Sequence, residues 1–232
     1  MATARPVPID ADAAAHQARV QRRSAQLLAA AARLMERDGS KSVSMQAVAA
    51  EAQVSVGLIY SYFGGKNDLL LAVIVDVLER FDAEVPRAIA AAGEDPVHRL
   101  VAAFRAYCEV IDQHRHAAVL TYRESKGLTA DGLDKIKELE VATSEPLRQI
   151  LKDGIAAQIF QPIDTDLVAY NLLLTAHAWA LKHWYFQRTL SLDTYVRKQT
   201  ALTLAALIAP RGRRKYAPLI AALNTPGDRS DL

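Results

Sequence analysis

Apolar residues recur at intervals of three and four along most of this 232-residue chain, which is the spacing of amphipathic α-helices. No segment alternates apolar and polar positions as a half-buried β-strand does, and the sequence has no internal repeat. The segment Gly93-Glu94-Asp95-Pro96 interrupts the pattern, and Pro96 suits the first turn of a helix. The pattern therefore predicts an all-α fold.

The first predicted helix begins near His16 and ends at Gly39, a residue that commonly terminates a helix. Arg19, Arg22 and Arg23 gather near its start. They suit DNA phosphates or a minor groove, and equally an ordinary solvated helix end, so both interpretations stay open. The predicted buried stripe consists of Val20, Ser24, Leu27, Ala31, Leu34 and Met35.

Two shorter helices follow within the segment 44–66. Ser44 and Ser55 each precede an apolar run, as N-cap residues whose hydroxyl oxygens accept an amide of the first turn. Two short helices joined by three or four residues match a helix-turn-helix unit. The residues predicted to be buried are Met45, Val48, Ala49 and Ala52 in the first helix, and Ile59 and Phe63 in the second.

The second of these helices leaves a face suited to DNA. Gly57 has no side chain, so the backbone can approach a base edge or a phosphate. The hydroxyls of two tyrosines and two serines suit phosphate oxygens, namely Ser55, Tyr60, Ser61 and Tyr62. Lys66 stands at the expected start of another helix, where free amides favour a phosphate. Alternatively, the tyrosines only cover the core. The predicted DNA contacts are Arg22, Ser44, Ser55, Val56, Gly57, Leu58, Tyr60, Ser61, Tyr62 and Lys66.

The run 22–71 resembles the N-terminal domain of TetR-family transcriptional regulators, through RRSAQLLAAAARLMERDG, SMQAVAAEAQVSVGLIYSYF and GGKNDLLLAVI. The resemblance implies a homodimeric repressor that binds a palindromic operator and releases it when a small molecule binds the C-terminal domain. Gln53 departs from the usual Gly in the turn, where a residue other than glycine in the left-handed conformation costs about 1 kcal/mol. Val56 and Leu58 replace polar or basic residues and favour contact with thymine methyl groups. Gly65 replaces a usual Ser.

The rest of the chain predicts a larger helical body. A helix from Asn67 to about Ala92 connects the two parts, and Pro146 should kink or divide the stretch 129–158. The predicted domains are a disordered tail at 1–15, the helix-turn-helix domain at 16–66, a ligand-binding and dimerisation domain at 67–209, and a basic, partly helical tail at 210–232. The remaining helices are predicted at 97–112, 117–126, 164–188 and from Ser191 or Asp193 to 209.

The last two of these helices carry apolar residues on more than one face, which indicates burial against both the body and a partner. The resemblance implies a four-helix dimer interface made by these helices. The segments TYRES and AHAWALKHWYF resemble parts of TetR-family regulators that respond to acyl-CoA thioesters, which implies a small hydrophobic effector with a fatty-acid or acyl chain, such as a fatty acyl-CoA. Alternatively, these residues are dimer core, and His177 is a core histidine. The predicted ligand contacts are Phe104, Tyr107, Cys108, Tyr122, Arg123, Leu147, Leu151, Leu174, His177, Ala178, Leu181 and Trp184.

Charge separates the parts of the chain. Residues 1–66 hold eight Lys and Arg against five Asp and Glu, residues 67–209 hold fifteen against nineteen, and residues 210–232 hold five against two. A basic excess at the proposed DNA-binding end is the electrostatic pattern of a DNA-binding module. The basic tail could add a phosphate contact or simply be solvated.

Other function classes find little support. No phosphate loop or nucleophile elbow occurs, and neither His114 with His116 nor His177 with His183 has metal-ligand spacing, so we predict no enzyme, no cofactor and no metal. One cysteine, no membrane span and no signal peptide predict a cytoplasmic protein. The alternative function is a helical ligand-binding or scaffold protein that no longer binds DNA, which the apolar Val56 and Leu58 keep open.

Overall fold

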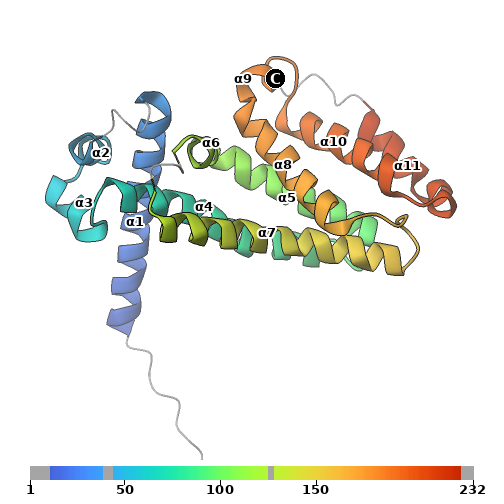
Figure 1. Ribbon diagram of the computed structural model, residues 1–232, viewed down its shortest axis with the longest axis horizontal. Helices are drawn as coiled ribbons and strands as arrows, with labels where there is room; N and C mark the ends of the chain where they lie inside the picture. The colour runs from blue at the N-terminus through green and yellow to red at the C-terminus, as the bar shows by residue number, and fades with distance from the viewer. Residues whose placement is uncertain (1–10, 39–43, 125–127, 226–232) are drawn as a thin grey trace, which may run out of the picture. The chain divides into compact units, whose positions relative to one another are not determined.

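The computed structural model describes residues 11–38, 44–124 and 128–225 (Figure 1). Within these ranges the ordered elements are helical, and the only β-type pairing is an isolated bridge between Phe160 and Ile208, so the all-α prediction is confirmed. The helices are α1 (Ala11–Asp38), α2 (Met45–Glu51), α3 (Val56–Tyr62), α4 (Lys66–Ala91), α5 (Pro96–Gln113), α6 (Arg115–Glu124), α7 (Ala130–Ala156), α8 (Thr165–Leu181), α9 (His183–Phe186), α10 (Leu192–Leu207), the 3-10 turn η2 (Pro210–Gly212) and α11 (Arg213–Asn224).

The chain forms two compact units, Met1–Asp76 and Val77–Leu232, and α4 runs through the division between them. Most of the tail predicted at 1–15 lies outside the described residues, but α1 already begins at Ala11, earlier than the expected start near His16. No helix in the described ranges is long and apolar enough to cross a membrane.

The N-terminal unit buries the predicted faces of its helices. α1 packs on α2 and α2 on α3, and the buried residues include Leu27, Ala31 and Leu34 of α1. Val20 was predicted to belong to this stripe, but it is exposed, because the first turns of α1 extend beyond the packed residues (Figure 1). The side chain of Met35 lies outside the described part. Partners from the other helices are Met45, Val48, Ala49, Ile59, Phe63, Leu69, Leu70, Val73 and Ile74.

The turn between α2 and α3 has the conformation that its sequence predicts. Gln53 has a φ of 56°, in the left-handed region that usually holds glycine. Its backbone amide donates to Ala50 O at 3.1 Å, and the amide of Val54 donates to Ala49 O at 2.9 Å. These bonds close α2 and set the direction in which α3 leaves.

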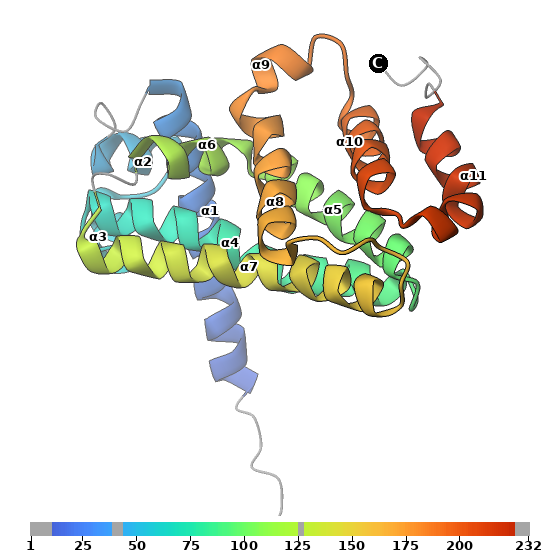
Figure 2. The ribbon, with the colours of Figure 1, turned by 45° about the vertical axis from the view of Figure 1, so that its right-hand side comes forward.

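In the C-terminal unit α5 is the central helix, because it packs against α7, α8 and α10 (Figure 2). Asp95 caps it, with its side chain accepting from Val97 N at 2.9 Å, and Pro96 occupies the first turn as predicted. The sequence predicted a kink or a division at Pro146, and the division does not occur, because α7 continues from Ala130 to Ala156 with Pro146 inside it. One long helix results because its buried face packs on α5 and α8.

The helix predicted at 164–188 starts after the Asp164 cap but ends at Leu181, where Lys182 leaves the helical conformation. The short helix α9 then packs back on Trp179. The ring of His183 meets the indole edge-on at 5.0 Å between centroids, and Phe186 stacks on it at 6.3 Å. These contacts require the chain to change direction, which explains the break.

The residues after α10 do not form a wholly solvated tail. α11 packs against α10, and both Lys215 Nζ and Tyr216 OH donate to Asp95 Oδ2 at 2.8 Å. These two donors and the Val97 amide lower the pKa of Asp95 to about 2, against the opposing effect of burial. The cap of α5 is thereby tied to the end of the described chain.

Candidate DNA-binding surface and effector region

The two serines predicted as caps lie at the N-termini of the two helices of the helix-turn-helix unit. Ser44 Oγ accepts from the amide of Ala47 at 3.1 Å, and Ser55 Oγ accepts from the amide of Leu58 at 3.2 Å. Each bond satisfies an amide that the first helical turn would otherwise leave unpaired. The starts of α2 and α3 are therefore set by local sequence.

α3 is held from one side only. Ile59 is fully buried and Phe63, just after the helix, is nearly so, and these two residues anchor it to the N-terminal unit. The side chain of Tyr60 is 52 % exposed on the opposite face, beside the exposed Ser61. Of the other predicted contacts, Ser44, Ser55 and Gly57 are exposed, whereas Val56, Leu58, Tyr62 and Lys66 are half-buried.

Among the described residues, no neighbouring atom requires a glycine at position 57. A Cβ atom built there would meet nothing within 4 Å, so the space over this residue is open. Ser61 Oγ donates to Leu58 O at 2.7 Å, which leaves the serine oxygen able to accept another bond. The exposed face of α3 thus combines open backbone with hydroxyl groups, which suits the backbone and groove edges of a duplex.

Arg22 belongs to a basic cleft formed by the first half of α1 and the end of α3. The cleft has a volume of about 580 Å³. The sequence singled out the three arginines, but it missed His16 and Gln26, which share their helix face at intervals of three and four residues. The lining residues are His16, Arg19, Val20, Arg22, Arg23, Gln26 and Tyr62.

The twelve predicted ligand contacts do not gather in one place. Tyr107 is fully buried, and its hydroxyl donates to the backbone carbonyl of Thr143. Burial raises the pKa of Tyr107 and of the Cys108 thiol, which keeps both groups neutral. Five of the twelve are core residues of α5 and α7: Phe104, Tyr107, Cys108, Leu147 and Leu151.

Tyr122 and His177 form the one polar pair in the predicted set. The Tyr122 hydroxyl lies 2.6 Å from His177 Nδ1. Desolvation lowers the pKa of His177 to about 4, and burial together with nearby Glu140 raises the pKa of Tyr122 to about 12. Both groups are therefore neutral near pH 7, and one donates a hydrogen bond to the other.

The remaining predicted contacts lie on or near the outer surface. Leu174 is 43 % exposed, Trp184 is 64 % exposed, and Arg123 is also exposed. Ala178 and Leu181 are half-buried. Leu174 and Trp184 are among the exposed large apolar residues of the helices α8, α9 and α10. These residues are here together called the α8–α10 apolar surface, and they are Leu167, Tyr170, Leu174, Trp184, Tyr185 and Leu202.

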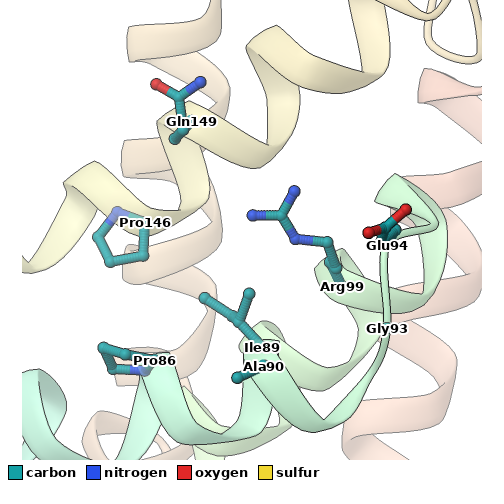
Figure 3. Close-up of a pocket in the computed structure, with 8 residues that line it drawn as sticks. All are labelled: Pro86, Ile89, Ala90, Gly93, Glu94, Arg99, Pro146 and Gln149. Carbon is teal, nitrogen blue, oxygen red and sulfur yellow. The ribbon is translucent and has the colours of Figure 1, made fainter.

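A cleft of about 690 Å³ lies elsewhere in the C-terminal unit, between α4, the start of α5 and α7 (Figure 3). The Arg99 guanidinium points into it, while Arg99 Nη1 also donates to Asp153 Oδ2 at 2.9 Å. None of the twelve predicted contacts lines this cleft, whose walls include Pro86 of α4 and Pro146 of α7. The lining residues are Pro86, Ile89, Ala90, Gly93, Glu94, Arg99, Pro146 and Gln149.

Comparison with known proteins assigns both units. Residues 27–73 match the family model described as bacterial regulatory proteins, tetR family, and residues 93–206 match the Tetracyclin repressor-like C-terminal domain. The chain is 37 % identical over 198 residues to the HTH-type transcriptional regulator HbdR of Aromatoleum sp. (strain CIB), covering 85 % of this chain and 86 % of that protein. It is 28 % identical over 164 residues to the HTH-type transcriptional repressor KstR2 of Mycolicibacterium smegmatis, covering 69 % of this chain and 78 % of that one.

Solved structures show the same fold. The ketosteroid transcriptional regulator KstR2 of Mycobacterium tuberculosis superposes with a TM-score of 0.67 at 23 % identity, covering 81 % of this chain and 95 % of that one. AibR, in complex with isovaleryl coenzyme A and operator DNA, gives a TM-score of 0.67 at 20 % identity, covering 78 % of this chain and 97 % of that one. At these identities the likeness concerns the fold alone.

Proposed function

Because the chain belongs to the tetR family of bacterial regulatory proteins, we propose that it is a homodimeric repressor that a small hydrophobic effector releases from a palindromic operator. Membership of the family makes it a transcriptional regulator with a helix-turn-helix that binds operator DNA, and not an enzyme. Repression, pairing and release by an effector are our proposals.

The observation that carries the proposal is the outward face of α3. Ile59 and Phe63 hold the helix from below, and the opposite face presents Gly57, Tyr60 and Ser61 to solvent. A helix held in this way can enter a major groove without giving up core contacts. We propose that the readout uses hydroxyl groups, close backbone approach and the apolar Val56 and Leu58 more than positive side chains.

The α8–α10 apolar surface supports pairing with a second copy. Leu167, Tyr170 and Leu174 recur at intervals of three and four along α8, and Leu202 of α10 is 68 % exposed. A cluster of exposed large apolar residues on a protein of this size marks an interaction surface. A dimer of this kind would set two α3 helices about 34–36 Å apart, one turn of DNA.

The cleft around Arg99 is the effector site that we propose. Pro86, Ile89 and Pro146 give it apolar walls, and its volume falls within the range of about 300–1,000 Å³ typical of small-molecule sites. α4 begins at Lys66 and contributes three wall residues near its C-terminal end, so a ligand bound there contacts the helix that continues into the N-terminal unit. The bound ligand would favour a subset of α4 positions and so shift the population that binds DNA.

For the effector itself we propose an acyl-CoA thioester. The resemblance of the segments TYRES and AHAWALKHWYF supports this class, as does the ligand named for AibR. The twelve residues predicted from the sequence stay a prediction, with Tyr122 and His177 as its polar pair.

DNA binding and release can be tested together. An operator would be selected from random duplexes, and affinity measured by fluorescence anisotropy at several salt concentrations, with light scattering for the mass of the free and bound protein. We expect one dimer per operator and salt-dependent affinity. Binding that does not exceed that of random DNA would favour the ligand-binding or scaffold alternative.

For release, isovaleryl-, octanoyl- and palmitoyl-CoA would be titrated into the complex, with free coenzyme A as control. The exposed Ala90 allows a cleft-filling variant, Ala90→Trp, which we expect to remain bound to the operator when the thioester releases the wild type. The comparison variant Tyr122→Phe leaves the cleft open. Release that is lost with Tyr122→Phe and kept with Ala90→Trp would move the effector site to the residues predicted from the sequence.

A further inference from the structure

The first half of α1 carries three arginines that have no acidic partner among the described residues. Within the described residues, Arg19 donates to the carbonyl of Ala15 at 3.3 Å, Arg23 donates to Gln26 Oε1 at 3.3 Å, and no carboxylate pairs with Arg19, Arg22 or Arg23. The cleft that they line contains no acidic residue. All three arginines are exposed, and none forms an ion pair within the described residues, although Arg23 also lines a neighbouring cleft that contains Glu51.

The second half of the same helix differs. Arg33 pairs with Glu51 at 3.4 Å, and Arg37 pairs with Asp38 at 2.9 Å and with Glu51 at 3.7 Å. Positive charge on α1 is thus neutralised within the chain near α2 and left available near the end of α3. Such a division is what an anion-binding surface at the start of α1 requires.

The position of Tyr62 in the lining places this cleft next to α3. Tyr62 is the last residue of α3, and it lines the cleft together with Arg22 and Arg23. An anion held there lies beside the end of α3. When α3 occupies a major groove, the anions nearest its end are phosphates of the same duplex.

We propose that this cleft binds DNA backbone phosphates that flank the bases read by α3, and that it extends the protein's footprint beyond the helix-turn-helix unit. Arginine suits this task because its planar guanidinium can donate two parallel hydrogen bonds to one phosphate. The family match begins at residue 27, so Arg19, Arg22 and Arg23 lie outside the matched segment. The inference rests on the proposed operator binding and adds a second contact surface to it.

Paired variants with equal charge changes test this assignment. Arg19→Gln/Arg22→Gln removes two positive charges from the cleft, and Lys135→Gln/Lys152→Gln removes two from exposed positions of α7. Affinity for an operator selected with the wild type would be measured between about 50 and 200 mM salt, the range over which phosphate contacts dominate affinity.

We expect the cleft variant to lower the slope of log affinity against log salt by up to about 3.6 per dimer, because each lost phosphate contact contributes about 0.9. The control variant should keep the wild-type slope. An unchanged slope in the cleft variant, or an equal reduction in both variants, would overturn the assignment. Thermal melting of both variants checks that each is folded.

Ethylation interference gives a readout that a loss of folding cannot imitate. Wild-type protein should show interference at phosphates beyond the bases read by α3, and the cleft variant should lose those positions while keeping the central ones. Retention of the flanking positions would place other residues there. If the wild type binds no selected duplex at all, the proposed operator binding fails, and that outcome is distinct from an altered slope or footprint.

Discussion

The hydroxyl of Tyr122 lies 2.6 Å from Nδ1 of His177 and joins α6 to α8 at a site where the imidazole is almost fully buried. Desolvation lowers the pKa of His177 to about 4, compared with about 6.5 in an unfolded chain. Between these values the unfolded chain binds more protons than the folded one, so stability falls as the pH drops through this range. Loss of the interaction would loosen α6.

We therefore predict that the free energy of unfolding decreases by up to about 3 kcal/mol between pH 7 and pH 4 on account of His177 alone. Urea denaturation at a series of pH values would measure it. His177→Gln, which cannot titrate, should flatten this part of the pH dependence, whereas Tyr122→Phe should lower stability by about 1 kcal/mol and keep the slope. A His177→Gln profile that parallels the wild type would refute this explanation.

Gly57→Ala separates folding from DNA binding. The added methyl group has no neighbour within 4 Å among the described residues, and alanine is the better helix former, so the melting temperature should stay unchanged or rise. If the backbone approaches the duplex here, the same methyl group weakens operator affinity by about tenfold, equivalent to about 1.4 kcal/mol. The melting temperature acts as the internal control, and full affinity in the stable variant would show that the backbone does not approach the DNA at this point.

Tyr60→Phe removes one exposed hydroxyl from α3. Because the ring is exposed and the hydroxyl is expected to reach a phosphate, operator affinity should fall for every sequence while the preference among sequences is kept. Titrations with the selected operator and with single-base variants of it would show this. Unchanged affinity removes Tyr60 from the set of contacts.

The left-handed turn residue offers a stability prediction. Gln53→Gly should raise the free energy of unfolding by up to about 1 kcal/mol, because glycine adopts a φ of 56° without strain. Gln158 has a similar φ of 58°, but it also accepts hydrogen bonds from Arg211, so Gln158→Gly should gain less. Chemical denaturation compares the two, and a larger gain at Gln158 would contradict the argument.

Gly154→Ala tests close packing in the C-terminal unit. A Cβ atom at this position would overlap the ring of Phe160, which is almost fully buried. Overpacking of this kind costs about 1–3 kcal/mol. Phe160→Leu in the same chain should recover part of that loss, because the two changes share one space. Additive losses in a double-mutant cycle would rule out the proposed overlap.

Several features of this fold follow from local chemistry and could be predicted. Ser44, Ser55, Asp164 and Ser191 each cap the helix that follows, because a side-chain oxygen satisfies amides only two or three residues away. The left-handed backbone at Gln53 is likewise a property of the turn. The candidate DNA-binding face of α3 depends on this local part of the sequence, since α3 and its anchors Ile59 and Phe63 are close together along the chain.

The candidate effector region was much less accessible to sequence analysis. Apolar residues are distributed around α8, so periodicity alone could not show that Leu174 faces outward while His177 is buried. The break at Lys182 depends on rings that return to Trp179, and the Arg99 cleft combines side chains from three helices. These arrangements depend on residues that are distant along the chain.

The sequence by itself determined the helical class, the capped ends of the helices, and the anchored and exposed faces of α3. Only the tertiary structure decided that Arg19, Arg22 and Arg23 share a cleft with Tyr62 while Arg33 and Arg37 are neutralised, and that the predicted ligand residues divide between core and surface. The physical reason is the separation along the chain between the residues that interact. Caps and turns are satisfied within a few residues, whereas burial and charge compensation depend on which helices pack together.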